Sequence, residues 1–92
     1  MHPPRPPLPP GASPAATAAA LTRALTARGI TGIYTATAAR VGLISVTAAL
    51  TIWTNGRQIW CTHAGQHYRW PAADIEAAAS DLAALARAGP GA

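Results

Sequence analysis

Residues 50–70 read LTIWTNGRQIWCTHAGQHYRW and decide the fold, because two turn signals separate three runs of strand-forming residues. Asn55–Gly56 supplies positive backbone φ angles at low cost, as a type I′ hairpin turn requires. Ala64–Gly65 marks the second turn. We therefore expect two consecutive antiparallel hairpins in this stretch.

Each hairpin has an expected register. A turn centred on Asn55–Gly56 predicts three pairs on one face and two on the other: Thr54–Arg57, Ile52–Ile59 and Leu50–Cys61, then Trp53–Gln58 and Thr51–Trp60. In the second hairpin we expect a loop with an even residue count, because a one-residue slip would move Arg69 into the apolar row. That loop predicts two pairs on the apolar face: Cys61–Tyr68 and Ile59–Trp70.

An alanine-rich helix is expected on each side of the strands. Ser13 is a favourable N-cap, Pro14 suits the first helical position, and Gly29 suits the position after the helix end. A second stripe of apolar residues at helical spacing starts at Ile75 and stops before the Gly-Pro-Gly of residues 89–91. The chain should therefore run from helix to strands to helix.

Four antiparallel strands are expected between the helices. The first covers Thr31–Thr37, with either Ile33 or Tyr34 facing inward, and a turn follows near residues 39–42. The other three strands share one apolar face, made of Ile44, Val46, Leu50 and Ile52; Ile59 and Cys61; and Tyr68 and Trp70. The fold class expected is α+β, a two-layer sandwich in which the helix Pro14–Arg28 and the C-terminal helix cover the same face of the sheet.

The length of 92 residues allows one small domain. Residues 1–12, MHPPRPPLPPGA, are expected to be a disordered proline-rich tail, residues 13–88 the single domain, and residues 89–92 a flexible C-terminus. Val41–Trp53 carries no charge, but a membrane span needs about 20 apolar residues, so we expect no membrane segment. We expect a cytoplasmic protein.

Groups that could support catalysis or bind metal are sparse. Cys61 and His63 point to the same face of a strand, where apolar neighbours should raise the thiol pKa and leave it unreactive. His67 is expected on the opposite face, so the four ligands of a structural zinc site are not assembled. The three carboxylates fall together around the last helix, at Asp74, Glu76 and Asp81. We expect no catalytic residue, no metal site and no cofactor.

The second face of the sheet is expected to be free of helices. It carries polar and aromatic residues that form a candidate interaction face: Thr51, Trp53, Gln58, Trp60, Thr62, His67 and Arg69. Arg69 opposite Trp60 permits a guanidinium–indole stack worth about 0.5–1 kcal/mol, and Trp53 should lie diagonal to Trp60. Interface centres are rich in aromatic residues and poor in charge. The sequence therefore predicts a small non-catalytic interaction module that forms a homodimer or binds a protein partner, unless a helix crosses over to cover the rings.

Nucleic-acid binding is the alternative. The net charge is +4, and residues 32–71 contain Arg40, Arg57 and Arg69 without any acid. The helix–strands–helix order resembles the double-stranded-RNA-binding domain in outline. That family has a lysine-rich start to its last helix, whereas the matching stretch Pro71–Glu76 is acidic here. The strand Gln66–Trp70 is expected at a sheet edge, which offers a second route to a dimer.

Three runs of the sequence, GITGIYTA at residues 29–36, LTIWTNGRQIWCTH at 50–63 and WPAAD at 70–74, are similar to short hypothetical proteins of actinobacteria. The likeness covers most of the chain after the tail. It implies the single small domain and no particular activity.

Overall fold

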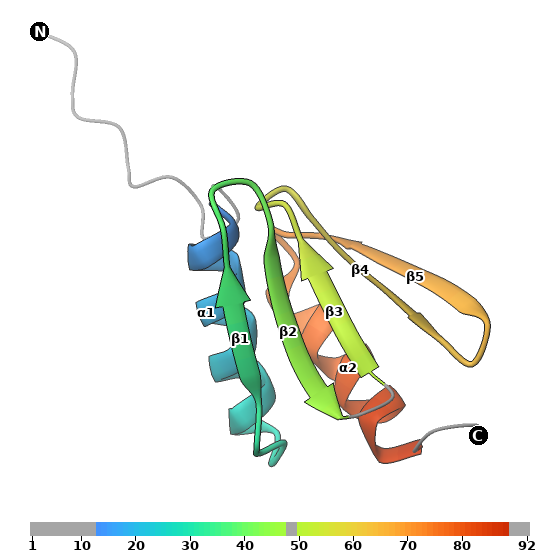
Figure 1. Cartoon of the computed structure of the whole chain (residues 1–92). Coiled ribbons are helices and arrows are strands. Elements are labelled where there is room, and N and C mark those ends of the chain that lie inside the picture. Colours follow the sequence, from blue (N-terminus) through green and yellow to red (C-terminus); the bar gives the residue numbers. More distant parts are fainter. Residues whose placement is uncertain (1–12, 48–49, 89–92) are drawn as a thin grey trace, which may run out of the picture.

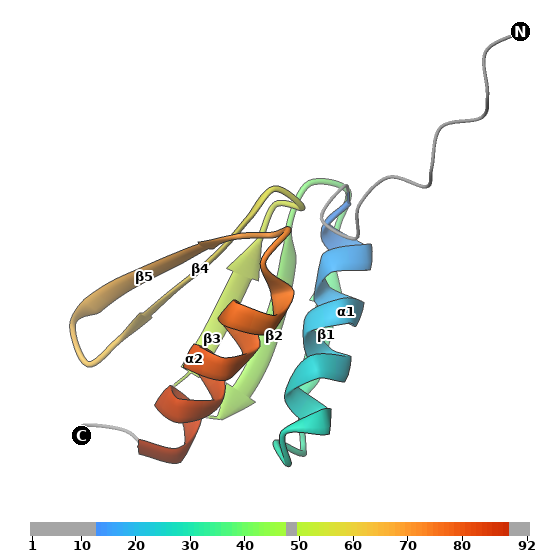
Figure 2. The same cartoon turned by 180° about the vertical axis from the view of Figure 1, so that it is seen from behind.

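Two helices flank a sheet of five antiparallel strands (Figure 1). The computed structural model describes residues 13–47 and 50–88, so the tail expected at 1–12 and the terminus expected at 89–92 lie outside the described residues. The elements are α1 (Pro14–Ala27), β1 (Tyr34–Thr37), β2 (Gly42–Thr47), β3 (Leu50–Thr54), β4 (Gln58–His63), β5 (Gln66–Pro71) and α2 (Ile75–Ala88). The strands are neighbours in chain order, and both helices lie on the same side of the sheet (Figure 2). The α+β class and the helix–strands–helix order are confirmed.

The prediction of four strands is wrong, because the stretch taken as one strand through residues 44–52 is the hairpin of β2 and β3. Thr47 pairs with Leu50, and a β-bulge between Ser45 and Thr47 interrupts the register. The residues between the two strands are alanines, so no Gly, Asn, Asp or Pro marks the turn. The first strand is also shorter than expected and begins at Tyr34 rather than Thr31.

The register of the β3–β4 hairpin is two residues away from the prediction. Ile52 pairs with Cys61, Trp53 with Trp60 and Thr54 with Ile59. A shift of two residues leaves every side chain on its expected face, because side chains alternate with a period of two. The apolar face is therefore as predicted, although its cross-strand pairs are not.

Side chains at the turn account for this register. The Thr54 hydroxyl donates to the Gln58 carbonyl at 2.7 Å and accepts from the Gly56 N–H at 3.1 Å. The Asn55 side-chain oxygen accepts from the backbone N–H groups of Arg57 and Gln58, both at 2.8 Å. Only Gly56 of the Asn55–Gly56 pair has a positive φ, so the predicted type I′ turn is not formed here.

Ala64–Gly65 forms the turn of the second hairpin with positive φ angles of 52° and 79°. Positive φ at both central residues is the signature of a type I′ turn. Cys61 pairs with Tyr68 and Ile59 with Trp70, as predicted. The even loop keeps Arg69 out of the apolar row.

Both ends of α1 follow the sequence signals. The Ser13 hydroxyl accepts from the Ala16 N–H at 3.0 Å, which caps the first turn. Gly29 has a φ of +88°, and the Ile30 N–H donates back to the Leu25 carbonyl at 3.1 Å. Arg28 is the C-cap, so the helix ends one residue earlier than expected.

The core lies between the helices and the inward face of the sheet. It consists of apolar residues from every element except β1, together with Ala72 of the β5–α2 connection: Ala18, Leu21, Ala24, Leu25, Ile44, Val46, Leu50, Ile52, Ile59, Cys61, Trp70, Ala72, Ala78, Ala79, Leu82 and Ala83. Ile33 is partly buried against this core, whereas 65% of Tyr34 is exposed, which settles the orientation of the first strand. The two helices are tied by an ion pair of 2.9 Å between Arg28 and Glu76.

Trp70 joins β5 to α2. Its indole N–H donates to the Asp81 carboxylate at 2.8 Å. Its ring stacks on Tyr68 with a centroid distance of 6.1 Å and an interplanar angle of 9°. Asp81 therefore accepts a hydrogen bond from a core residue, a contact that its position in the sequence did not predict.

Replacing Gly42 with alanine should destabilise the fold. A Cβ at this position would lie 3.2 Å from the Pro14 carbonyl oxygen and 3.2 Å from a methyl carbon of Thr54, so the start of α1 would have to move. We expect a loss of about 1–3 kcal/mol in the free energy of unfolding, measured by urea denaturation. Thr37→Val, at the exposed position paired with Gly42, is the control. Equal stability of Gly42→Ala and the control would contradict the packing described.

Asp81→Ala should also destabilise the protein, because it leaves the N–H of a buried indole without its acceptor. The expected loss is about 1–3 kcal/mol. Asp81→Asn, which removes the same charge but keeps a side-chain oxygen that can accept from the indole N–H, is the matched control. Thermal unfolding of both variants tests this prediction. An equal loss of stability in the two would mean that the charge, and not the hydrogen bond to Trp70, stabilises the fold.

Candidate functional site: the open face of the sheet

The open face is the side of the sheet opposite the helices. One row of residues crosses all five strands on this face: Ala36, Leu43, Trp53, Trp60 and Arg69. Beside it, Tyr34, Ser45 and Thr51 form a row across β1, β2 and β3, and Thr62 pairs with His67 on β4 and β5. Gln58 lies beside them, opposite Pro71. All seven residues of the predicted interaction face are therefore on one side of the sheet. No helix among the described residues covers them (Figures 1 and 2).

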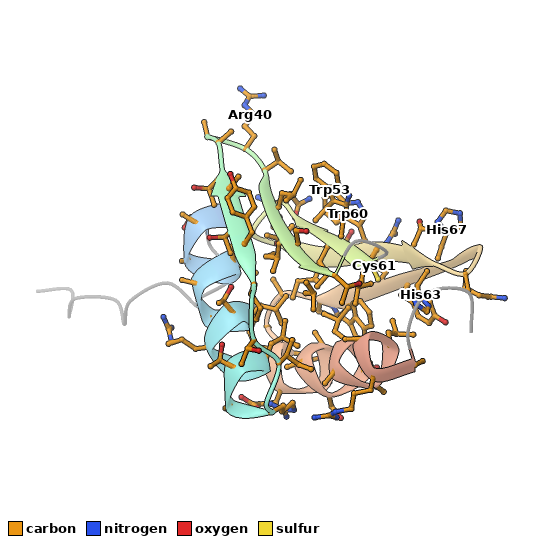
Figure 3. The ribbon with its side chains drawn as sticks, turned by 60° about the horizontal axis from the view of Figure 1, so that its bottom comes forward. Arg40, Trp53, Trp60, Cys61, His63 and His67 are labelled. Carbon is orange, nitrogen blue, oxygen red and sulfur yellow. The ribbon has the colours of Figure 1, made fainter. Side chains whose placement is uncertain are left out.

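The two tryptophans lie at the centre of this face. Trp53 is directly opposite Trp60, not diagonal to it as expected, because of the shifted register. Trp53 is 38% exposed and Trp60 is partly buried. Figure 3 shows both side chains projecting away from the helices.

Along the row that contains the tryptophans, the side chains are apolar on the β1 side and charged on the β5 side. Leu43 is opposite Trp53 on one side, and Arg69 is opposite Trp60 on the other. Among residues 13–47 and 50–88 the ring stack that forms is that of Tyr68 on Trp70, on the covered face, and not the expected stack of Arg69 on Trp60. The Arg69 side chain is exposed.

A shallow hollow of about 230 Å³ lies beside Trp60 on β4 and β5. It is lined by Trp60, Cys61, His67, Tyr68 and Arg69. The His67 ring nitrogen Nδ1 lies 3.1 Å from the Thr62 hydroxyl, which holds the imidazole across the strand pair. The hollow therefore combines an indole wall with two basic side chains.

Charge is divided between the two sides of the molecule. The three acids of the chain are Asp74, just before α2, and Glu76 and Asp81 within it. On the described open face the charged side chain is that of Arg69, and His67 and Tyr34 are the other titratable ones. The described open face therefore carries positive charge without an acid, whereas the helix side holds the three acids together with Arg23, Arg28 and Arg87.

The three predicted nucleic-acid contacts are not gathered at one point. Arg40 is in the β1–β2 turn and Arg57 in the β3–β4 turn, and these two turns lie at the same end of the sheet (Figure 1). Arg69 is within β5, opposite Trp60. The arginines thus border the open face rather than forming a continuous basic patch.

Cys61 and His63 both point toward α2, on the covered face (Figure 3). Burial raises the pKa of the Cys61 thiol from its ordinary 9.0 to about 11, which keeps it protonated and a poor nucleophile at neutral pH. His67 is on the other side of the sheet, as expected. In the described ranges, no three His, Cys, Asp or Glu side chains are close enough to hold a metal ion.

No protein-family model, curated protein or solved structure matches this chain. None of the helices in the described residues is long and apolar enough to cross a membrane. The geometry of the sheet is therefore the basis for the function proposed below.

The sequence did not predict that β1 and Leu43 of β2 contribute to the open face. Leu43 extends the tryptophan row, and a second hollow of about 210 Å³ lies beside it. That hollow is lined by Ala36, Thr37, Ala38, Val41 and Leu43. Leu43 was missed because residues 44–52 were predicted as one strand. Only the hairpin of β2 and β3 brings Leu43 opposite Trp53.

The Cys61 thiol should react slowly in the folded protein. At pH 8, a pKa of about 11 instead of 9.0 lowers the thiolate fraction about 100-fold, and burial limits access further. We expect labelling by an aromatic disulfide reagent to be at least that much slower in buffer than in denaturant. Equal rates in the two conditions would show that Cys61 is exposed.

Proposed function

We propose that this chain is a small non-catalytic interaction module that binds protein through its open face. The observation that supports this proposal is the direct opposition of Trp53 and Trp60 on a side of the sheet without helix cover. Aromatic residues in the centre of a surface, with arginine at its margin, are typical of binding hot spots. The partner to test first is a second copy of the chain.

The neighbours of the tryptophans favour a protein partner. Leu43, Thr51 and Thr62 are uncharged, so the centre of the face can lose its water at low electrostatic cost. The hollow beside Trp60 can receive a side chain of the partner. Burial of these groups would also enlarge the thin core of a domain this small.

Single-stranded nucleic acid is the second candidate, and the division of charge favours it. The described open face carries Arg69 and His67 with no acid, and two indole rings lie next to them. Bases stack on exposed aromatic rings, and arginine contacts phosphate. Such binding would weaken steeply with salt, whereas an apolar protein contact would not.

Trp60→Ala should weaken self-association by at least about tenfold without unfolding the protein, because a central aromatic anchor carries much of the binding energy. Light scattering over a range of concentrations, at low and high salt, measures this, with circular dichroism as the check on folding. Gln66→Ala, at the exposed end of β5, is the control. We expect the association of the unmodified chain to change little with salt.

Two results would overturn the proposal. Loss of stability with unchanged mass in Trp60→Ala would show that Trp60 belongs to the core. Binding of a fluorescent single-stranded oligonucleotide at low salt, with release near physiological salt and no self-association, would favour the nucleic-acid function instead.

A further inference from the structure

The two edge strands of the sheet, β1 and β5, differ in how well they are protected against pairing with another chain. Every residue of β1 is exposed, and its sequence, Tyr-Thr-Ala-Thr, contains no charge and no proline. At the other edge, β5 carries His67, Arg69 and Pro71. Charged residues and proline prevent an edge strand from pairing with another chain. β1 therefore has none of the protection that β5 has.

The hydrogen-bond pattern shows which groups of each edge are free to pair. The Ala38 N–H donates to the Val41 carbonyl at 2.8 Å, and hydrogen-bonded and non-hydrogen-bonded pairs alternate along an antiparallel ladder. Ala36 and Tyr34 therefore bond to β2. Thr35 and Thr37 direct their N–H and C=O groups away from the sheet.

The same alternation explains why β5 is poorly suited to pair with a strand of another chain. The Ala72 N–H donates to the Arg57 carbonyl at 2.8 Å, so the outward positions of β5 are His67, Arg69 and Pro71. Pro71 has no N–H to donate. This edge was one expected route to a dimer, and its chemistry is less suitable than that of β1.

We propose that β1 pairs antiparallel with β1 of a second copy, around a two-fold axis that passes through Ala36. In this register Thr35 forms hydrogen bonds with Thr37 of the second copy, since these are the residues whose backbone groups face outward. Ala36 lies opposite its own equivalent on the axis. Tyr34 lies opposite Ala38 of the second copy.

The surface around β1 is self-complementary in this arrangement. Tyr34 is 65% exposed and projects from the open face. Beside Ala38 lies the hollow of about 210 Å³ whose lining includes Ala36, Val41 and Leu43. Each Tyr34 ring is thus brought to the hollow of the other copy. A closed two-fold dimer requires a self-complementary surface, in which a side chain of each copy fits a hollow of the other.

Such pairing joins two five-stranded sheets into one. A two-fold axis perpendicular to the sheet keeps both open faces on the same side and all four helices on the other. Trp53 and Trp60 of the two copies would then lie on a single continuous surface. The edge contact uses the backbone groups of β1 and does not need the tryptophan pair of the open face, so either contact can exist alone.

A cysteine at position 36 tests the axis directly. In the proposed register the two residues 36 form a non-hydrogen-bonded pair with Cα atoms about 4.5 Å apart, within the range of about 4.4–6.8 Å that a disulfide spans. Ala36→Cys should form a covalent dimer under mild oxidation. Ala38→Cys is the matched control, because residue 38 faces Tyr34 and its own equivalent is out of reach. The unmodified chain is the second control, since Cys61 is buried.

Charge exchange at the same position tests the pairing without a covalent bond. Ala36→Lys and Ala36→Glu each place like charges together on the axis and should weaken dimerisation by about tenfold or more. An equimolar mixture of the two variants should restore the dimer, because the charges are then opposite. Ala77→Lys and Ala77→Glu, on the exposed side of α2, are the controls. Light scattering measures each species, and circular dichroism confirms that each folds.

Three results would overturn the edge dimer: a monomeric unmodified chain at all concentrations, equal cross-linking of Ala36→Cys and Ala38→Cys, or no recovery of the dimer on mixing the charged variants. A dimer that survives all changes at position 36 but is lost in Trp60→Ala would place the contact on the open face. The edge proposal would then be wrong and the proposed function would stand.

Discussion

The β-bulge between Ser45 and Thr47 determines which residues of β3 face the helices. If the ladder continued regularly from the Thr47–Leu50 pair, Trp53 would lie opposite Ile44 and share its buried face. The extra residue restores the pairing of Ile44 with Ile52, so Trp53 turns to the open face and meets Trp60. The bulge thus places the apolar residues of β3 on the side of the helices and Trp53 on the open face.

The composition of the helices allows them to cover one face only. Half of their buried positions are alanines, including Ala24, Ala78 and Ala79, and small residues let two helices approach closely over a narrow sheet. The Arg28–Glu76 ion pair and the Trp70–Asp81 hydrogen bond hold α2 beside α1 and against β5. These contacts also keep two of the three acids on the helix side. The confinement of the acids to the helix side and the exposure of the indoles therefore both follow from the packing of α2.

Much of this arrangement could be predicted from periodicity and caps. The ends of α1, the Ala64–Gly65 turn and the outward side of the sheet follow local rules that act over a few residues. The β2–β3 hairpin could not be predicted, because the two alanines between its strands are not turn-forming residues and the bulge preserves the even-numbered apolar pattern of a single strand. The register at Asn55 also escaped prediction, since the side chains of Thr54 and Asn55 select it through hydrogen bonds rather than through turn propensity. The acceptor role of Asp81 depends on a contact between distant elements, which periodicity does not encode.

Hydrogen exchange of the three indole N–H groups tests most directly whether the sheet has one covered and one open face. The measurement uses protein diluted until light scattering gives the monomer mass, with each resonance assigned from a Trp→Phe variant. The account predicts slow exchange for Trp70, which donates to Asp81, and fast exchange for Trp53 and Trp60. Protection of Trp53 or Trp60 as strong as that of Trp70 would contradict it, because both rings would then be covered within a single chain.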